Sequence, residues 1–351
     1  MKTDQPVEIR TGEEINTANL NDYLQKNLPH IGKIIGQKQF PGGYSNLTYL
    51  LSTETSEYII RRPPFGAAIK SAHDMGREFK LLTLLRDHYS RIPKPVILCE
   101  DEGVIGAPFY IMSRVKGVIL RPPSVKEIRF GSQEMRKISE SLVDNLAAIH
   151  SLDIHKTGLA QLGKPDGYIQ RQVEGWTKRY VAAQTDSISD MESLSTWLAQ
   201  NQPADGSPTL LHNDYKYDNL VLNEGNLSDI IGVLDWEMAT VGDPWMDVGA
   251  SLAYWAQEGE GELAKVFNIS WLPGNLSRKE VVERYTEKSG RSIKNPVFYY
   301  VFGLYKNAVI AQQIYARWKQ GHSKDSRFGS LIHVIRDLGT RGSKAIDTDS
   351  I

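Results

Sequence analysis

The first third of the chain contains short apolar runs bounded by turn residues, a pattern that predicts β-strands. The clearest runs are Lys33–Phe40, Leu47–Ser52, Glu57–Arg62 and Ala107–Met112. Pro41–Asn46, which contains two adjacent glycines, separates the first two runs and predicts a turn. We therefore expect a small β-rich region at the start of the chain.

Elsewhere apolar residues recur every three or four positions, which is the period of an amphipathic helix. Glu134–His150 shows this most clearly, with an apolar stripe formed by Met135, Ile138, Leu142, Leu146 and Ile149. Further helices are expected at Asn19–Leu28, after Asp74, at Ile169–Tyr180, at Ser187–Gln200 and over much of 248–338, followed by a frayed last dozen residues. This part of the chain is predicted to be mainly helical.

A polar loop between two short apolar runs carries the candidate chemistry. His212, Asp214 and Asn219 have the spacing His-x-Asp-x-x-x-x-Asn, and Asp235 follows a later apolar run at 230–234. In protein kinases an Asp and an Asn at this interval face the substrate hydroxyl and hold a metal ion. Each residue alone has a structural explanation, such as a turn, a cap or a buried histidine. The fixed spacing with a carboxylate after a strand is more specific.

Three segments carry a family resemblance: 212–219, 233–237 and 242–249. The chain resembles the aminoglycoside phosphotransferase and choline kinase family from about residue 32 to about 320. Within it, the chain is most similar to the subgroup also found fused to acyl-CoA dehydrogenases, which acts on hydroxyacyl-CoA. The resemblance implies a two-lobed, protein-kinase-like α+β fold, with a small β-rich N-lobe and a larger, mainly helical C-lobe.

The resemblance also implies that the two lobes have different functions. We expect residues 1–115 to form the nucleotide-binding N-lobe and 116–351 to form the C-lobe, with the catalytic loop, metal site and acceptor site. Ser113 and Val115 lie in the expected connection between the lobes. In kinase-like proteins the backbone of this connection hydrogen-bonds the adenine edge.

The turn after the first strand is a candidate phosphate-binding loop. Gly43, Ser45 and Asn46 lie in it, and a glycine loop lets backbone N–H groups approach phosphate oxygens without a Cβ in the way. The alternative is an ordinary hairpin turn, since two glycines do not make the longer glycine-rich motif of protein kinases.

A cation on the third strand is expected to hold the inner phosphates. Position matching assigns Arg61 to this role, where many kinases have lysine. Side chains alternate across a strand, so only one of Arg61 and Arg62 points toward the nucleotide, and we favour Arg61. Glu78 matches the helix glutamate that pairs with this cation, although a solvated surface glutamate fits the pattern equally well.

These residues together predict transfer of the γ-phosphoryl group of ATP to a small-molecule hydroxyl, with Mg²⁺ as the metal. Asp214 is expected to orient the acceptor hydroxyl and take its proton. Lys216 is expected to contact the γ-phosphate, or else to be a solvated loop lysine. Asn219 and Asp235 are the expected Mg²⁺ ligands. Asp247 is expected to brace the catalytic loop by accepting backbone N–H bonds.

Charge, apolar runs and cysteine content limit the classes of partner and the location that we expect for this chain. The 351 residues include 41 Lys plus Arg and 42 Asp plus Glu, so the net charge of −1 does not favour a nucleic-acid partner. No apolar run is long enough to predict a membrane span, and the N-terminus lacks the apolar segment of a signal peptide. Cys99 is the only cysteine, which excludes an internal disulfide and fits a cytoplasmic location. The oligomeric state stays open.

The acceptor is the least constrained part of the prediction. The span from Arg291 to Lys324 contains no Asp or Glu, several aromatic residues and six basic residues: Arg291, Lys294, Lys306, Arg317, Lys319 and Lys324. If this basic and aromatic span lines the acceptor site, it would suit an anionic acceptor with an apolar body, such as a hydroxyacyl thioester. The alternative is that the charges are solvated and the aromatic side chains form core. An aminoglycoside- or choline-type kinase, a nucleotide-binding pseudokinase and a metal-dependent phosphate hydrolase also remain open.

Overall fold

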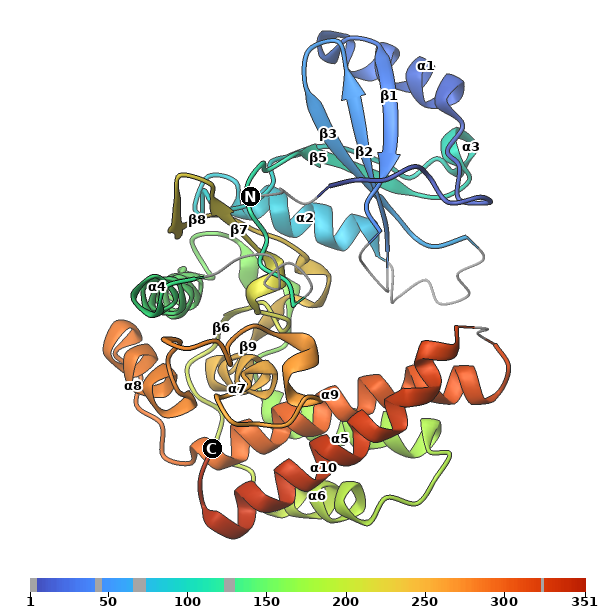
Figure 1. The fold of residues 1–351 in the computed structure, drawn as a ribbon. Coiled ribbons are helices and arrows are strands. Elements are labelled where there is room, and N and C mark those ends of the chain that lie inside the picture. The colour runs from blue at the N-terminus through green and yellow to red at the C-terminus, as the bar shows by residue number, and fades with distance from the viewer. Residues whose placement is uncertain (1–4, 42–45, 66–73, 123–129, 323–324) are drawn as a thin grey trace. The chain divides into compact units, whose positions relative to one another are not determined.

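A computed structural model describes residues 5–41, 46–65, 74–122, 130–322 and 325–351 (Figure 1). The chain forms two compact units. The first contains Met1–Ile119, Leu220–Asn226 and Ile230–Glu237, and the second contains Leu120–Asn219, Leu227–Asp229 and Met238–Ile351. Predicted Gly43 and Ser45 lie outside the described residues, as does Lys324.

The first unit is built on a five-stranded antiparallel sheet of order β1-β2-β3-β5-β4. The strands are β1 (Ile34–Gln39), β2 (Leu47–Thr53), β3 (Glu57–Arg62), β4 (Pro95–Cys99) and β5 (Phe109–Ser113). The central strands bury apolar side chains such as Tyr49, Ile60 and Ile111, which are inaccessible to solvent. Burial of these side chains explains why the short runs form a sheet.

Three helices accompany the sheet: α1 (Thr17–Asn27), α2 (Met75–Leu85) and the short α3 (Glu102–Ile105). Helix α1 contributes Leu20 and Leu24 to the same core. Helix α2 begins after Asp74, whose side chain accepts the backbone N–H of Arg77 and so caps the helix. It packs on β4 and β5, which brings Glu78 to the sheet.

Later segments of the chain complete the first unit. The hairpin strands β7 (Leu220–Asn223) and β8 (Asn226–Val233) pair with each other. Val118 forms an isolated antiparallel bridge with Leu222, so the hairpin pairs with the segment that follows β5. The residues after β8, including Asp235, are thereby part of the same unit as β3.

The second unit is mainly helical. Its helices are α4 (Ser132–His150), α5 (Tyr168–Ala183), α6 (Ser189–Gln200), α7 (Pro244–Tyr254), α8 (Arg278–Ser289), α9 (Pro296–Lys319) and α10 (Leu331–Thr348). Strands β6 (Thr209–Leu211) and β9 (Thr240–Gly242) form a small antiparallel pair. Helix α9 packs against α5, α6, α7 and α10, which explains why most of its side chains are buried.

The predicted order of a β-rich first part and a helical second part is confirmed, but some helix ends differ. The last dozen residues were expected to fray, whereas α10 continues to Thr348 because side chains such as Leu338 and Ala345 are buried. Helix α7 begins at Pro244 rather than Val248, since Asp243 caps it and proline favours a first turn. Among the described residues, no helix has the length and apolarity to cross a membrane.

Candidate active site

The loop between β6 and β7 is braced by one buried carboxylate. Asp247, on α7, accepts the backbone N–H of His212 at 2.6 Å and that of Asn213 at 2.8 Å, as expected from the sequence. The Asp247 carboxylate also contacts the ring of His150, whose Nε2 lies 3.1 Å from one carboxylate oxygen. Burial alone would raise the pKa of Asp247, but the contacts with His150 and His212 outweigh it and lower the pKa. The brace is therefore an ionised group at neutral pH.

Asn213 gives the loop a sharp change of direction. Its φ of 65° lies in the left-handed region, which a non-glycine residue occupies only when its surroundings hold it there. Its side-chain amide donates to the carbonyl of Met238 at 3.0 Å. Its own carbonyl accepts from the Lys306 ammonium, on α9, at 2.6 Å. Asp214 follows directly after this residue.

The Asp214 carboxylate contacts two other predicted residues, Lys216 and Asn219. The Lys216 ammonium is 3.0 and 2.9 Å from its two oxygens, and the Asn219 amide donates to one of them at 2.9 Å. Asn219 also donates to the Asp214 carbonyl at 2.8 Å. Burial opposes the charge on Lys216, yet the neighbouring Asp214 raises the pKa of this lysine well above its usual value. Lys216 is therefore not a solvated loop lysine.

Tyr254, at the end of α7, completes this cluster. The Lys216 ammonium lies 4.7 Å from the centre of the Tyr254 ring, a cation–π distance. Burial, with Asp214 close by, raises the pKa of the Tyr254 hydroxyl far above its usual range, so the hydroxyl stays protonated. It is a hydrogen-bond donor beside the carboxylate.

A second cluster lies within the first unit. The Arg61 guanidinium, on β3, is 3.4 Å from Glu78, 2.9 Å from Asp235 and 3.2 Å from Glu237. The side chain of Arg61 is only 9% exposed. Burial alone would lower the pKa of Arg61, but the three carboxylates raise it well above its usual value. Burial raises the pKa of Glu78, and the positive charge of Arg61 partly offsets this rise.

The two adjacent arginines have different partners. Arg62 donates to the carbonyl oxygens of Pro63 and Ile105, and its guanidinium lies 3.7 Å from the centre of the Phe65 ring. Arg61 alone of the two joins the acidic cluster. The alternation of side chains along β3 explains this difference.

Three further predicted nucleotide-binding residues, Asn46, Ser113 and Val115, are among the described residues of the first unit. Asn46 donates from its side-chain amide to Glu237 at 2.7 Å. Ser113 ends β5, where its backbone N–H donates to Lys94 at 2.8 Å. Val115 follows in the segment that connects β5 to the rest of the chain.

The basic residues from Arg291 to Lys319 do not form one wall. Lys306 is buried against the catalytic loop, Lys319 pairs with Asp186 at 2.8 Å, and Arg291 donates to backbone carbonyls of Ser207 and His150. Most of the aromatic residues in this span are buried and form core: Phe298, Tyr299, Tyr300, Phe302, Tyr305 and Tyr315. The aromatic side chains therefore form core, as the alternative interpretation expected, but the charges are not all solvated, because Lys306 is buried.

Glu237 and Tyr254 were given no role in these clusters from the sequence, and Lys306 was expected only in the basic span from Arg291 to Lys324, not beside the catalytic loop. Glu237 is two positions after Asp235, a short-range signal that could have suggested a second carboxylate beside Arg61. Tyr254 and Lys306 belong to helices far along the chain from Asp214, and no local spacing connects them to it. Their positions depend on how α7 and α9 pack.

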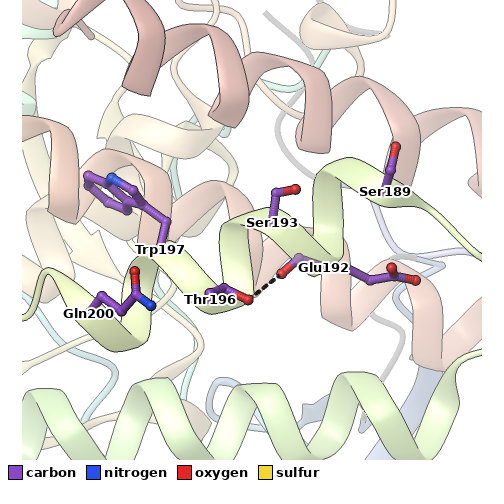
Figure 2. A pocket seen from close by; sticks show the side chains of 6 residues that line it. All are labelled: Ser189, Glu192, Ser193, Thr196, Trp197 and Gln200. Atoms are coloured by element: carbon purple, nitrogen blue, oxygen red, sulfur yellow. Dashed lines mark hydrogen bonds between the residues drawn. The ribbon is translucent and has the colours of Figure 1, made fainter.

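A separate groove lies along α6 (Figure 2). Its volume is about 520 Å³, and it is lined by Ser189, Glu192, Ser193, Thr196, Trp197 and Gln200. All of these side chains come from one helix, and none belongs to either cluster. The groove is open to solvent, and the predicted chemistry does not lie in it.

Comparison with curated proteins finds relatives that carry a further region. The chain is 34% identical over 348 residues to acyl-CoA dehydrogenase family member 11 of Rattus norvegicus, covering 97% of this chain and 44% of that protein. It is 34% identical over 307 residues to acyl-CoA dehydrogenase family member 10 of Mus musculus, covering 86% and 28%. The chain thus spans less than half the length of these relatives.

Comparison with solved structures and family models identifies the fold. A "putative aminoglycoside phosphotransferase" from Ralstonia eutropha JMP134 matches with a TM-score of 0.81 and 29% identity, over 95% of this chain and 99% of that one. The GDP complex of aminoglycoside 2'-phosphotransferase-IIIa matches with a TM-score of 0.61 and 15% identity, over 93% and 99%. These matches confirm the expected kinase-like phosphotransferase fold. Residues 36–281, which include both clusters, match the model of the phosphotransferase enzyme family, and the chain belongs to that family.

Proposed function

We propose that this chain transfers the γ-phosphoryl group of ATP to a hydroxyl of a small molecule, in the presence of Mg²⁺. Its membership of the phosphotransferase family supports the reaction class. The observation that carries the proposal is the Asp214 carboxylate, held by Lys216 and Asn219 on a loop that Asp247 braces. This is a preorganised carboxylate, and phosphoryl transfer depends chiefly on positioning and charge.

Asp214 is the proposed base. It would orient the acceptor hydroxyl and take its proton as the hydroxyl oxygen attacks phosphorus. Lys216 holds both Asp214 oxygens and carries a firmly protonated ammonium, so it can also contact a transferred phosphoryl group. The exposed fraction of the two side chains, 16% for Asp214 and 18% for Lys216, leaves a narrow access to this pair.

The Arg61 cluster is the proposed site for the inner phosphates. Glu78 would hold the guanidinium in place, as the 3.4 Å ion pair supports. Arginine presents a planar fork of donors that matches phosphate oxygens. Backbone N–H groups of Gly43, Ser45 and Asn46 would add phosphate contacts. The connecting segment that includes Ser113 and Val115 would contact the adenine through its backbone.

Asn219 and Asp235 are the proposed Mg²⁺ ligands. Their side chains supply one amide oxygen and one carboxylate, which fits an ion that prefers oxygen and is often held by only one or two carboxylates with water and phosphate. Among the described residues, no group of three His, Cys, Asp or Glu side chains forms a denser metal site. Mg²⁺, when bound, would neutralise charge on the outer phosphates. This donor set favours a kinase over a two-metal hydrolase.

A hydroxyacyl compound is the proposed acceptor. Leu263, Val266 and Phe267 are exposed by 37%, 52% and 38%, and the Phe267 ring lies 6.4 Å from the Tyr254 ring beside Asp214. Exposed apolar side chains this close to the base would accept an apolar chain. The relatives named as acyl-CoA dehydrogenases also favour an acyl compound. The basic residues of α9, which are dispersed, do not support the anionic part of this proposal.

The experiment is ADP release from ATP and Mg²⁺ with hydroxyacyl-CoA compounds, kanamycin, choline or no acceptor. We expect hydroxyacyl-CoA to stimulate release and kanamycin to have no effect. If kanamycin or choline stimulates release and hydroxyacyl-CoA does not, the proposed acceptor is wrong. Nucleotide binding without any release would identify a pseudokinase, and release that ignores every acceptor would identify a hydrolase.

A further inference from the structure

Helix α9 carries a lysine in an unusual environment. Lys306 is only 3% exposed, although lysine is almost never fully buried without a partner. Its ammonium lies 2.6 Å from the carbonyl oxygen of Asn213. It also lies 5.9 Å from the centre of the Trp176 ring, on α5. A buried ammonium costs free energy, so its presence here calls for a function beyond packing.

The charges around Lys306 belong to the catalytic loop and its brace. Asp214 and Asp247 attract the ammonium, and Lys216 repels it. Burial outweighs these attractions and lowers the pKa of Lys306. The lysine is therefore held where its charged form is disfavoured, and its hydrogen bond goes to the residue that precedes Asp214.

Lys306 contacts the peptide unit between Asn213 and Asp214 at its carbonyl, and the N–H of the same unit donates to His212 Nδ1 at 3.3 Å. The N–H of Asn213 is fixed by Asp247, and its side chain is fixed by Met238. Lys306 fixes the remaining polar group, the carbonyl. Asn213 has the left-handed φ of 65°, so rotation of this peptide unit would redirect Asp214. The contact from α9 opposes that rotation.

We propose that Lys306 is a positioning residue, which acts through the Asn213 carbonyl to aim the Asp214 carboxylate at the acceptor hydroxyl. This inference rests on the proposed function, because it assumes that Asp214 is the base. A small misplacement of a catalytic group can lower a rate about 100-fold, so the positioning effect is measurable in kcat.

The test replaces Lys306 by methionine, which has a similar length and no ammonium. In Lys306→Met we expect kcat for ADP release to fall at least about tenfold with a medium-chain hydroxyacyl-CoA as the probe. The KM for ATP should change less than about twofold, since Lys306 is not expected to contact the nucleotide. The unfolding midpoint should fall only slightly, since the loss of a disfavoured buried charge offsets the cost of the unpaired Asn213 carbonyl. A purely structural lysine would lower the midpoint and leave kcat of the folded protein unchanged.

Two further variants make the result specific. Lys306→Gln keeps a hydrogen-bond donor without the charge, and it should recover part of the kcat lost in Lys306→Met. Lys319→Met removes an exposed lysine of the same helix, paired with Asp186, and should leave kcat unchanged. A normal kcat in Lys306→Met would overturn the proposal. So would loss of the folded state in both Lys306 variants, which would make Lys306 a residue of the fold alone.

The parallel variant Asp214→Asn separates this inference from the proposed function. If Asp214→Asn is inactive and Lys306→Met is normal, the role of Lys306 is wrong and the base assignment stands. If Asp214→Asn keeps full activity, the base assignment itself is wrong. Water in place of the hydroxyacyl-CoA gives a second probe, because the proposed base would also orient a water molecule for basal ATP hydrolysis.

Discussion

The Asp214 carboxylate is already satisfied by the Lys216 ammonium and the Asn219 amide. Asp214→Asn keeps the shape of the side chain but removes the proton acceptor. We therefore expect kcat to fall by about 10²–10⁴-fold, the usual effect of losing a general base. ATP affinity, measured by calorimetric titration, should change little. Loss of ATP binding together with activity would contradict this division of roles.

Asp247 is a buried, charged residue whose hydrogen bonds hold the catalytic loop. Its pKa is lowered in the folded protein from an ordinary value of 3.8, so the ionised form stabilises the fold. This contribution is present above the unfolded pKa and is lost as the pH falls through the folded pKa. Asp247→Asn should lower the free energy of unfolding at pH 7 by about 3–5 kcal/mol, as removal of a buried ionic partner does.

The measurement for Asp247 is urea unfolding at pH 7 and at successively lower pH down to about 3. The wild-type protein should lose stability below about pH 4, and the Asp247→Asn protein should lose less over the same range. Equal losses in both proteins would show that other carboxylates govern the acid sensitivity.

Side-chain directions set by adjacent positions in the chain were predicted correctly. The alternation along β3 separated Arg61 from Arg62. The ion pair of Arg61 with Glu78 is present, and it was suggested by the family resemblance, since the local pattern fitted a solvated glutamate equally well. The functional roles of both remain predictions. Tyr254 and Lys306 could not be found in this way, because tertiary packing alone brings them to Asp214.

At the scale of elements, the contact between α7 and α9 depends on two glycines. A Cβ at Gly303 would lie 2.2 Å from the carbonyl oxygen of Gly249, and a Cβ at Gly249 would lie 2.1 Å from the carbonyl oxygen of Tyr299. These obstacles are backbone atoms, which cannot rotate away. Close approach of the helices places Asp247 and Tyr254, on α7, beside the helix that carries Lys306.

Gly303→Ala is therefore expected to separate α7 from α9. Overpacking of this kind typically costs about 1–3 kcal/mol, so the unfolding midpoint should fall measurably. Activity should fall too, since α7 and α9 both hold the catalytic loop. The matched control is Gly261→Ala, where a Cβ would meet no atom within 4 Å. A Gly303→Ala protein as stable as the control would show that the helices can shift at little cost.

Helix ends were predicted less well than helix centres. Sequence periodicity located α4 within two residues, since its stripe of five apolar side chains faces the core. The end of α10 looked polar and was expected to fray, but packing on α9 and α6 keeps it helical. The start of α7 was set by a cap and a proline that precede its apolar stripe. Periodicity alone does not detect such signals.

At the scale of the whole molecule, the chain order does not follow the compact units. Residues 220–226 and 230–237 belong to the first unit although they follow the catalytic loop. A single boundary near residue 115 does not include residues 220–226 and 230–237 in the first unit. The hairpin that contains most of them pairs with Val118 of that unit. The assignment of nucleotide binding to 1–115 and of catalysis to 116–351 remains a prediction.

Metal dependence is the remaining prediction at this scale. A ligand that binds only the folded protein stabilises it by about 2.7 kcal/mol at one hundred times its dissociation constant. ATP with Mg²⁺ should therefore raise the unfolding midpoint more than ATP with EDTA. In Asp235→Ala this Mg²⁺-dependent difference should vanish, along with Mg²⁺-dependent turnover, because the proposed carboxylate ligand is gone.

The comparison must be made within each variant, because Asp235 also pairs with Arg61 at 2.9 Å. Its removal leaves a buried guanidinium with fewer carboxylates, which lowers the midpoint even without ligand. The difference between Mg²⁺ and EDTA cancels this effect. Glu224→Ala, which removes an exposed carboxylate of the same hairpin, should keep the full difference. An undiminished Mg²⁺ response in Asp235→Ala would move the metal to other ligands and leave Asp235 as a partner of Arg61 alone.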